Sequence, residues 1–264
     1  MAVKMGTCAL CLNERELQES HLLPSALYKR ARDRSSRNPH PLLFSAHGES
    51  QTSRQATKFL LCACCEQRFH RLGEDWVLKH CAQEPREFKL RELLLEHSCD
   101  KLTEDIFCFY CDAIPAIDAD ALCYFAISII WRNAVTSWII DGRPIPRSDL
   151  GPFVEPFRAY LVGDAAFPSN TVVWVCVSAL EEVLMLSTMP ESRKWGTYRS
   201  HFFSIPGVHL PVDVGMRIPS GIRDLCLFRG RGRPLLYTPL SDLVNARDYI
   251  RLRQDRNRRP RQKR

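Results

Sequence analysis

Two pairs of cysteines, each with two residues between its members, constrain the fold of this chain more than any other feature. The first pair is Cys8 and Cys11, and the second is Cys62 and Cys65. Four thiolates in two such pairs are the ligand set of a closed, tetrahedral structural zinc site. An ion held this way joins two segments that lie far apart in the sequence. We therefore expect residues 1–80 to form a zinc-stapled module.

Other interpretations of these cysteines are less consistent with the sequence. Cys64 competes for a ligand position, but two intervening residues give a better zinc geometry than one. Buried, reduced cysteines are the plain alternative. The N-terminus lacks the apolar stretch of a secretion signal, so metal ligands are favoured over disulfides. The longest uncharged apolar run, 121–131, is shorter than the roughly 18 residues that a membrane span needs. We expect a cytoplasmic protein with no membrane partner.

A second group of cysteines lies further along the chain. Its members are Cys81, Cys99, Cys108 and Cys111. They could in principle hold another zinc ion, but their spacing is poor and their neighbours are apolar. We expect them to pack in the core.

The net charge of +7 is unevenly distributed. Residues 246–264 carry nine Arg or Lys and two Asp, so this tail accounts for the whole surplus. Such a tail is either a disordered, solubilising end or an arm that touches phosphate. Residues 29–58 are also basic and are expected to form a loop or a loose hairpin. Their candidate phosphate-binding residues are Lys29, Arg30, Arg32, Arg34, Arg37, Arg54 and Lys58.

Periodicity predicts an α+β fold for residues 81–245. The strongest helix is 120–138, whose apolar residues recur at a 3.6-residue period, with Asp118 or Asp120 as its N-cap and a turn at 141–144 as its end. Shorter helices are expected at 66–81 and, less definitely, at 88–96, where a strand-to-helix passage is the alternative. Pro and Gly interrupt 206–221. Strands are predicted at 171–177, 183–186, 202–205 and 225–228. The expected architecture is one long helix against a small sheet.

Four motifs in the N-terminal region together resemble one enzyme family. They are the first cysteine pair, Glu-Ser-His-Leu-Leu-Pro at 19–24, Leu-Leu-Cys-x2-Cys-Glu at 60–66, and Gly-Glu-Asp-Trp at 73–76. They look like HNH endonucleases, and more narrowly a bacterial subgroup with a Ser-His-Ile-Ile-Pro-type motif. The resemblance covers residues 8–78 and extends weakly to 128–132. It implies a ββα-metal, treble-clef-like module in which a β-hairpin packs on a helix.

The resemblance also implies a reaction, the metal-dependent hydrolysis of phosphodiester bonds in DNA. His21 matches the general base, since a neutral imidazole can take a proton from the attacking water. Glu66 matches a metal-ligand position of the family, and His70 follows one helical turn later. Oxygen and imidazole ligands suit a catalytic Mg²⁺ or Mn²⁺ ion, which would stabilise the leaving oxygen. The basic residues of 29–58 and the tail would contact the DNA backbone.

The sequence departs from the family pattern in two places. Ser20 stands where many members have an acidic residue or a histidine, and the middle Asn of the family name has no counterpart. A non-catalytic zinc finger that binds nucleic acid or a protein partner is therefore the alternative function. A second alternative places the main activity in the C-terminal domain, as a sensor or adaptor. Glu74 is expected to be a surface charge, and Trp131 with Arg132 to lie at the core and its rim.

Overall fold

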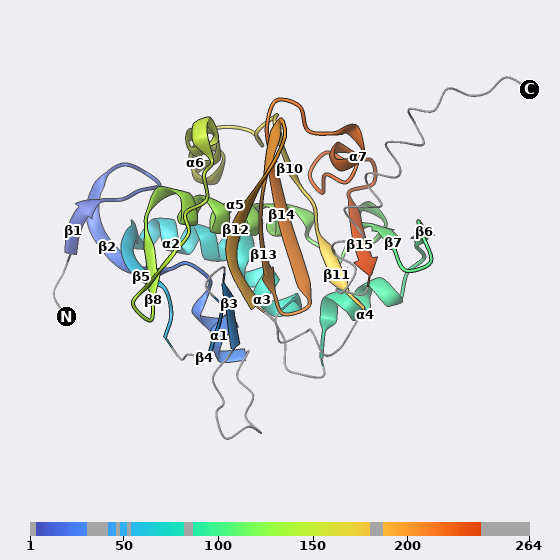
Figure 1. Ribbon diagram of the computed structural model, residues 1–264, viewed down its shortest axis with the longest axis horizontal. Coiled ribbons are helices and arrows are strands. Elements are labelled where there is room, and N and C mark those ends of the chain that lie inside the picture. The colour runs from blue at the N-terminus through green and yellow to red at the C-terminus, as the bar shows by residue number, and fades with distance from the viewer. Residues whose placement is uncertain are drawn as a thin grey trace, which may run out of the picture.

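The computed structural model describes residues 4–30, 42–45, 48–51, 54–81, 87–179 and 187–238. Helices and sheets are both present, in agreement with an α+β fold (Figure 1). The expected strand at 183–186 and the basic tail lie outside the described residues. So do Arg32, Arg34 and Arg37, and the side chains of Lys29 and Arg30.

The N-terminal region is built on a three-stranded antiparallel sheet in the order β1-β2-β5. Its strands are β1 (Lys4–Thr7), β2 (Glu14–His21) and β5 (Thr57–Cys62). Helix α2 (Ala63–Phe69) follows β5 directly, so two antiparallel strands lead into a helix. Within the long connection from β2 to β5, helix α1 (Ser25–Arg30) precedes a hairpin of β3 (Leu42–Ser45) and β4 (Gly48–Gln51). Residues 29–58 were expected to form a loop or a loose hairpin, and a hairpin is present in part of this connection.

The helix expected at 66–81 is present but is not regular. Helix α2 continues through a π-helical turn, η1 (His70–Glu74), into α3 (Asp75–His80). A Cβ atom at Gly73 would lie 3.0 Å from the backbone nitrogen of Phe125. A π-helical turn inserts an extra residue into the helix. Together with the glycine, this turn lets the segment pack closely against the long helix of the C-terminal region.

That long helix, α5 (Ala119–Val135), begins as expected. The Asp118 carboxylate caps it and accepts a hydrogen bond of 2.8 Å from the backbone N–H of Ala121. The helix ends three residues earlier than predicted, because Thr136 is extended and Trp138 turns back. The indole N–H of Trp138 donates to the carbonyl of Arg132 at 3.0 Å, which satisfies one of the free carbonyls at the helix end.

The turn expected at 141–144 belongs to a hairpin instead. Trp138 opens β8 (Trp138–Ile140), which pairs with β9 (Arg143–Ile145). Asp141 and Gly142 connect the two strands with φ values of 50° and 74°. Positive φ at both central residues is the conformation that tight two-residue hairpins favour.

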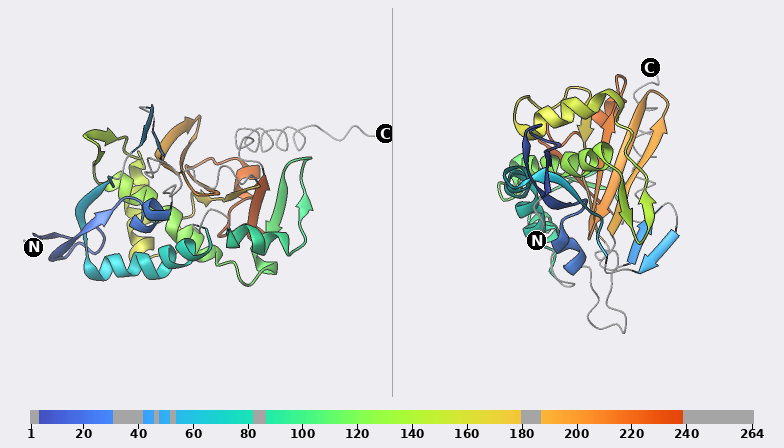
Figure 2. Two further views of the ribbon diagram at one scale, coloured as in Figure 1. Left: turned by 90° about the horizontal axis from the view of Figure 1, so that it is seen from below. Right: turned by 90° about the vertical axis from the view of Figure 1, so that its left-hand side faces the viewer.

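The larger sheet of the described residues has ten strands, eight from the C-terminal region and β3 and β4 from the N-terminal connection, so the expectation of a small sheet was wrong. Its order is β4-β3-β12-β13-β14-β11-β15-β7-β6, with β10 paired to β14. Helix α5 runs along one face of this sheet (Figures 1 and 2). Phe125 from the helix meets Phe203 from β13 edge to face, with ring centroids 5.8 Å apart. The strands not yet given are β6 (Asp100–Lys101), β7 (Phe107–Tyr110), β10 (Thr171–Val173), β11 (Cys176–Ser178), β12 (Ser187–Trp195), β13 (Tyr198–Ile205), β14 (Val208–Val214) and β15 (Pro234–Thr238).

Several strand predictions need correction, while the one at 202–205 lies within β13. The expected strand 171–177 is two short strands, β10 and β11, with Trp174 and Val175 between them. Strand β14 occupies part of the Pro- and Gly-rich stretch 206–221, where no strand was expected. Residues 225–228 form turns rather than a strand, because their N–H groups bond to carbonyls three residues earlier or to β10. Their apolar character reflects burial in a loop.

One continuous cluster of buried side chains runs from Cys8 to Leu236. Helix α5 lies inside it and contacts both η1 and the large sheet. The boundary at residue 80 stays a prediction. Among the described residues, no helix combines the length and apolar character needed to cross a bilayer. The remaining helices are α4 (Lys89–Leu95), η2 (Cys111–Ala113), η3 (Gly151–Phe153), α6 (Val154–Val162) and α7 (Ser220–Arg223).

Candidate metal centre and adjoining polar cluster

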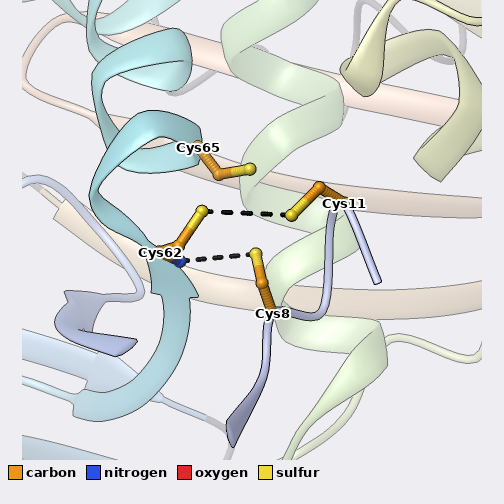
Figure 3. A group of neighbouring side chains, drawn as sticks. All are labelled: Cys8, Cys11, Cys62 and Cys65. Atoms are coloured by element: carbon orange, nitrogen blue, oxygen red, sulfur yellow. Dashed lines mark hydrogen bonds between the residues drawn. The ribbon is translucent and has the colours of Figure 1, made fainter. Parts of the chain in front are cut away.

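The four predicted cysteines come together at the junction of the small sheet and α2. Cys8 and Cys11 lie in the turn between β1 and β2, and Cys62 ends β5. Cys65 lies in the first turn of α2, and the four side chains converge in Figure 3. The turn is closed by backbone hydrogen bonds from Cys8 N–H to the carbonyl of Asn13 and from Leu12 N–H to the carbonyl of Cys8. We call these four residues the cysteine centre.

The cysteine centre has the dimensions of a metal site. Its four sulfur atoms lie within 4.8 Å of one another. The Sγ atoms of Cys11 and Cys62 are 3.9 Å apart. A tetrahedral zinc ion with Zn–S bonds of about 2.3 Å needs sulfur atoms about 3.8 Å apart. The four cysteines are therefore close enough to hold a metal ion, as the spacing predicted. Cys64 is exposed and is not among the four.

The charges of these sulfur atoms also favour a cation. The hydrogen bond from the Cys65 thiol is the largest cause that lowers the pKa of Cys8, to about 4. The same contact raises the pKa of Cys65 well above its ordinary value, and burial adds to the increase. One thiolate thus forms at the expense of its neighbour. Full deprotonation of four adjacent sulfur atoms needs a positive ion among them.

A shallow hollow of about 280 Å³ adjoins the cysteine centre. Three arginines are among its lining residues, Arg15 from β2, Arg68 from α2 and Arg71 from η1. The positive charges of these arginine side chains counter the negative charge of nearby thiolates. They were not among the basic residues that the sequence singled out.

Strand β2 carries Ser20 and His21 to its C-terminal end. Ser20 is buried, and its hydroxyl oxygen accepts a hydrogen bond of 3.2 Å from the backbone N–H of Leu61. The Ser20 hydroxyl in turn donates to Oε1 of Glu66 in α2. His21 is half-buried at the end of the strand. The predicted base and the predicted ligand Glu66 thus belong to one neighbourhood, linked through Ser20.

Arg132, in the last turn of α5, places a positive charge in this neighbourhood. It is 1% exposed, and its guanidinium lies over the ring of Phe69 at 4.6 Å from the ring centroid. Nη2 is 2.7 Å from Oε1 of Glu74 and 3.9 Å from Oε2 of Glu66. Nη1 donates to the backbone carbonyl of His21 at 3.3 Å. We call Ser20, His21, Glu66, Glu74 and Arg132 the Arg132 cluster.

Two residues of the Arg132 cluster were misjudged from the sequence. Glu74 is not a surface charge, since its side chain is 12% exposed and paired with Arg132. Arg132 is fully inside the core and not at its rim. The available signal was an arginine near the end of an otherwise apolar helix, because a buried arginine requires acidic partners. The sequence around Arg132 did not show which acidic residues are its partners.

The donors expected to bind a catalytic Mg²⁺ or Mn²⁺ ion do not fit one. Oε1 of Glu66 is bonded to Ser20, and Oε2 lies beside the Arg132 guanidinium. His70 is exposed at the start of η1. Within the described ranges, the only group of three or more His, Cys, Asp or Glu ligand atoms close enough for an ion is the cysteine centre. We therefore derive no reaction step through such an ion.

Among the basic residues proposed to bind phosphate, the structure describes the side chains of Arg54 and Lys58. Nε of Arg54 lies 3.5 Å from Oδ1 of Asp141, in the turn of the β8–β9 hairpin. Nζ of Lys58 donates to the carbonyl of Ser137 at 3.3 Å. Both residues are exposed and are tied to the segment that follows α5. Their contact with DNA stays a prediction.

The second group of cysteines does not form a metal site among the described residues. Cys81, Cys108 and Cys111 are buried, and Cys99 is exposed. Burial raises the pKa of Cys81 and raises that of Cys111 to about 12. The three buried thiols pack in the core as expected, whereas the expectation was wrong for Cys99.

Comparisons of the chain with models of protein families, with curated proteins and with solved structures found no match.

Proposed function

We propose that this protein is an endonuclease that hydrolyses phosphodiester bonds in DNA, with His21 as its general base. The observation that carries the proposal is the position of His21. It ends a strand that packs on α2 beside a four-cysteine centre, and its backbone is held by Arg132. This is the arrangement that the resemblance to HNH endonucleases implies for the general base.

The proposed chemistry of His21 is proton transfer. A neutral imidazole can accept a proton from water as that water attacks phosphorus. The bond from phosphorus to the leaving 3′-oxygen breaks in the same step, and that oxygen takes a proton from solvent. His21 is half-buried, so part of the residue remains accessible to solvent. The hydrogen bond from Arg132 to the His21 carbonyl restricts the backbone that carries the ring. Restricting the base in this way favours a productive geometry.

The ion at the cysteine centre is proposed to be zinc with a structural role. Four thiolates close the tetrahedral shell and leave no position for water or substrate. The ion would hold the β1–β2 turn against α2 and so support the strand that carries His21. The function of the C-terminal region within this proposal is to supply α5, whose Arg132 holds the same strand.

The second candidate function is a non-catalytic module that binds nucleic acid or a protein partner. The engagement of Glu66 by Ser20 and Arg132 favours this candidate, because the family's ligand position is already occupied by protein groups. The two candidates differ in one respect. Only the endonuclease requires the imidazole of His21.

The test is nicking of supercoiled plasmid by the full-length, zinc-loaded chain and by His21→Ala prepared identically. His97→Ala is the matched control, since His97 is an exposed histidine at the end of α4. The endonuclease predicts cleavage by the parent and by His97→Ala, and none by His21→Ala. Equal cleavage by all three proteins would reveal a contaminant. No cleavage by any of them, with plasmid binding retained, would replace the endonuclease by the binding module.

A further inference from the structure

We infer that the guanidinium of Arg132 takes the place of a divalent cation at Glu66, so that the Ser20–His21 site holds no metal ion of its own. The described residues would then hold one metal ion, at the cysteine centre. The inference rests on the proposed function in one respect, which is that Glu66 stands at a ligand position of HNH endonucleases. The contacts that support it are independent of any activity.

The first contact is the hydrogen bond between Ser20 and Glu66. The Ser20 oxygen already accepts the N–H of Leu61, so its hydroxyl hydrogen is directed to Oε1 of Glu66. Ser20 and Glu66 stand at two positions where the family has metal ligands, and here they bond directly to each other.

The second contact is the guanidinium itself. Arg132 lies between the carboxylates of Glu66 and Glu74 and meets both with the same nitrogen. Its position is fixed by the Phe69 ring and by the His21 carbonyl, and its side chain is 2% exposed. An ion bound to Oε2 of Glu66 at about 2.1 Å would lie within about 6 Å of this buried positive charge. A cation of the protein therefore already lies beside the carboxylate that the ion would need.

The third observation concerns the remaining donors. A divalent ion of the Mg²⁺ type needs several oxygen or nitrogen ligands in near-octahedral geometry. Among the described residues, no histidine or acidic side chain joins Glu66 in a group that could supply them. His70, the expected second ligand, is exposed on η1. The site is organised around the guanidinium, which makes Arg132 a positioning residue for Glu66 and for the His21 backbone.

The experiment is a titration of the zinc-loaded, full-length protein with Mn²⁺, followed by the electron paramagnetic resonance signal of free Mn²⁺. Wild type is compared with Glu66→Gln, which keeps the side-chain shape and removes the charge. The inference predicts one zinc per chain and superimposable Mn²⁺ curves for the two proteins. An equivalent of Mn²⁺ that wild type binds and Glu66→Gln does not would overturn it.

A second variant tests the same point from the other side. Arg132→Met removes the guanidinium from beside the carboxylates of Glu66 and Glu74, so a Mn²⁺ ion whose remaining ligands are water should bind there, in an equivalent that the further change Glu66→Gln abolishes. If Arg132→Met retains its zinc and its circular dichroism spectrum but gains no Mn²⁺ site, the substitution of an ion by the guanidinium is wrong. If it does not fold, the comparison of wild type with Glu66→Gln decides alone.

These outcomes separate the inference from the proposed function. If the protein nicks plasmid and binds a Mn²⁺ ion through Glu66, the endonuclease proposal stands and the inference is wrong. If the protein binds no such ion and cleaves no DNA, the inference stands and the endonuclease proposal is wrong.

Discussion

The cysteine centre and the Arg132 cluster are neighbours that share α2, yet they neutralise charge in opposite ways. The cysteine centre gathers four sulfur atoms that become negative when deprotonated, and three arginines line the adjoining hollow. The Arg132 cluster gathers two carboxylates around a buried guanidinium. Four thiolates that converge on one point favour a cation between them. In the Arg132 cluster the chain supplies the positive charge itself, from α5. This charge joins the N-terminal strands to the long helix without a metal ion.

The largest expected effect comes from the substitution Cys65→Ser. A hydroxyl is a poor zinc ligand, and zinc binding by such sites is worth about 10–16 kcal/mol, comparable to the total stability of a domain. We expect the zinc content to fall from one per chain and the N-terminal region to become sensitive to protease. Cys64→Ser, at the exposed neighbouring cysteine, should change neither. Equal zinc content in both variants would contradict the assignment of the four ligands.

Arg132→Met should have the next largest effect, because it leaves the charges of Glu66 and Glu74 without their partner. Breaking a buried ion pair from one side typically costs about 3–5 kcal/mol. The free energy of unfolding in urea should fall by this amount at constant zinc. Lys89→Met removes an exposed cation 3.7 Å from Glu87 and should cost only about 0–1 kcal/mol. A cost for Arg132→Met no larger than that of the control would show that the cluster is not a buried ion-pair network.

Acid acts on the cysteine centre, whose sulfur atoms it protonates, and also on a histidine of the large sheet that lies outside both sites. Burial lowers the pKa of His201 to about 4, from about 6.5 in the unfolded chain. The folded-state pKa is the lower one, so its contribution to stability is complete above pH 6.5 and is lost as the pH falls toward 4. At 1.36 kcal/mol per pH unit, the loss reaches about 3 kcal/mol.

The variant His201→Gln isolates that part of the acid response. Glutamine can still bond to the Ser192 hydroxyl, which lies 2.7 Å from Nδ1 of His201. Unfolding free energies measured between pH 7 and pH 4 should therefore fall less steeply than for the parent. The remaining dependence of the unfolding free energy on pH would come from the cysteine centre and other groups. Parallel curves would mean that His201 does not titrate on unfolding.

The smallest of these effects is expected for Ser20→Ala. The change removes the hydrogen bond to Glu66 and leaves the buried N–H of Leu61 without its acceptor, at a cost of about 1–3 kcal/mol. Thr7→Val, which removes a hydroxyl bonded to Glu14 on the exposed edge, should stay within about 0.5 kcal/mol. If the two substitutions cost the same, Ser20 does not link the strand to α2.

Much of the local structure could be predicted from the sequence. The spacing of the cysteines identified all four members of their centre, because the ligand geometry requires short loops. The period of the apolar residues located α5 and one of its two candidate N-caps, Asp118. These features depend on neighbours within a few residues. The strand at 225–228 was wrong because an apolar run indicates burial and does not distinguish a strand from a buried turn.

The Arg132 cluster could not be predicted in the same way. Its residues come from β2, α2, η1 and α5, and only the fold brings them together. Glu74 has the same local sequence context as many surface glutamates, so helical spacing could not identify its partner. Strand β14 was not predicted, because proline is rare in central strands and Pro211 lies within it. The Pro211 carbonyl accepts a hydrogen bond from the backbone N–H of Trp174, and β14 pairs with three other strands.

The most direct test of the account is plasmid nicking by zinc-matched wild type and His21→Ala, because only a nuclease with this base requires that imidazole. The account predicts that wild type converts supercoiled plasmid to the nicked form and that His21→Ala does not, at equal zinc content. Nicking by His21→Ala at the wild-type rate, from preparations free of contaminating nuclease, would contradict it.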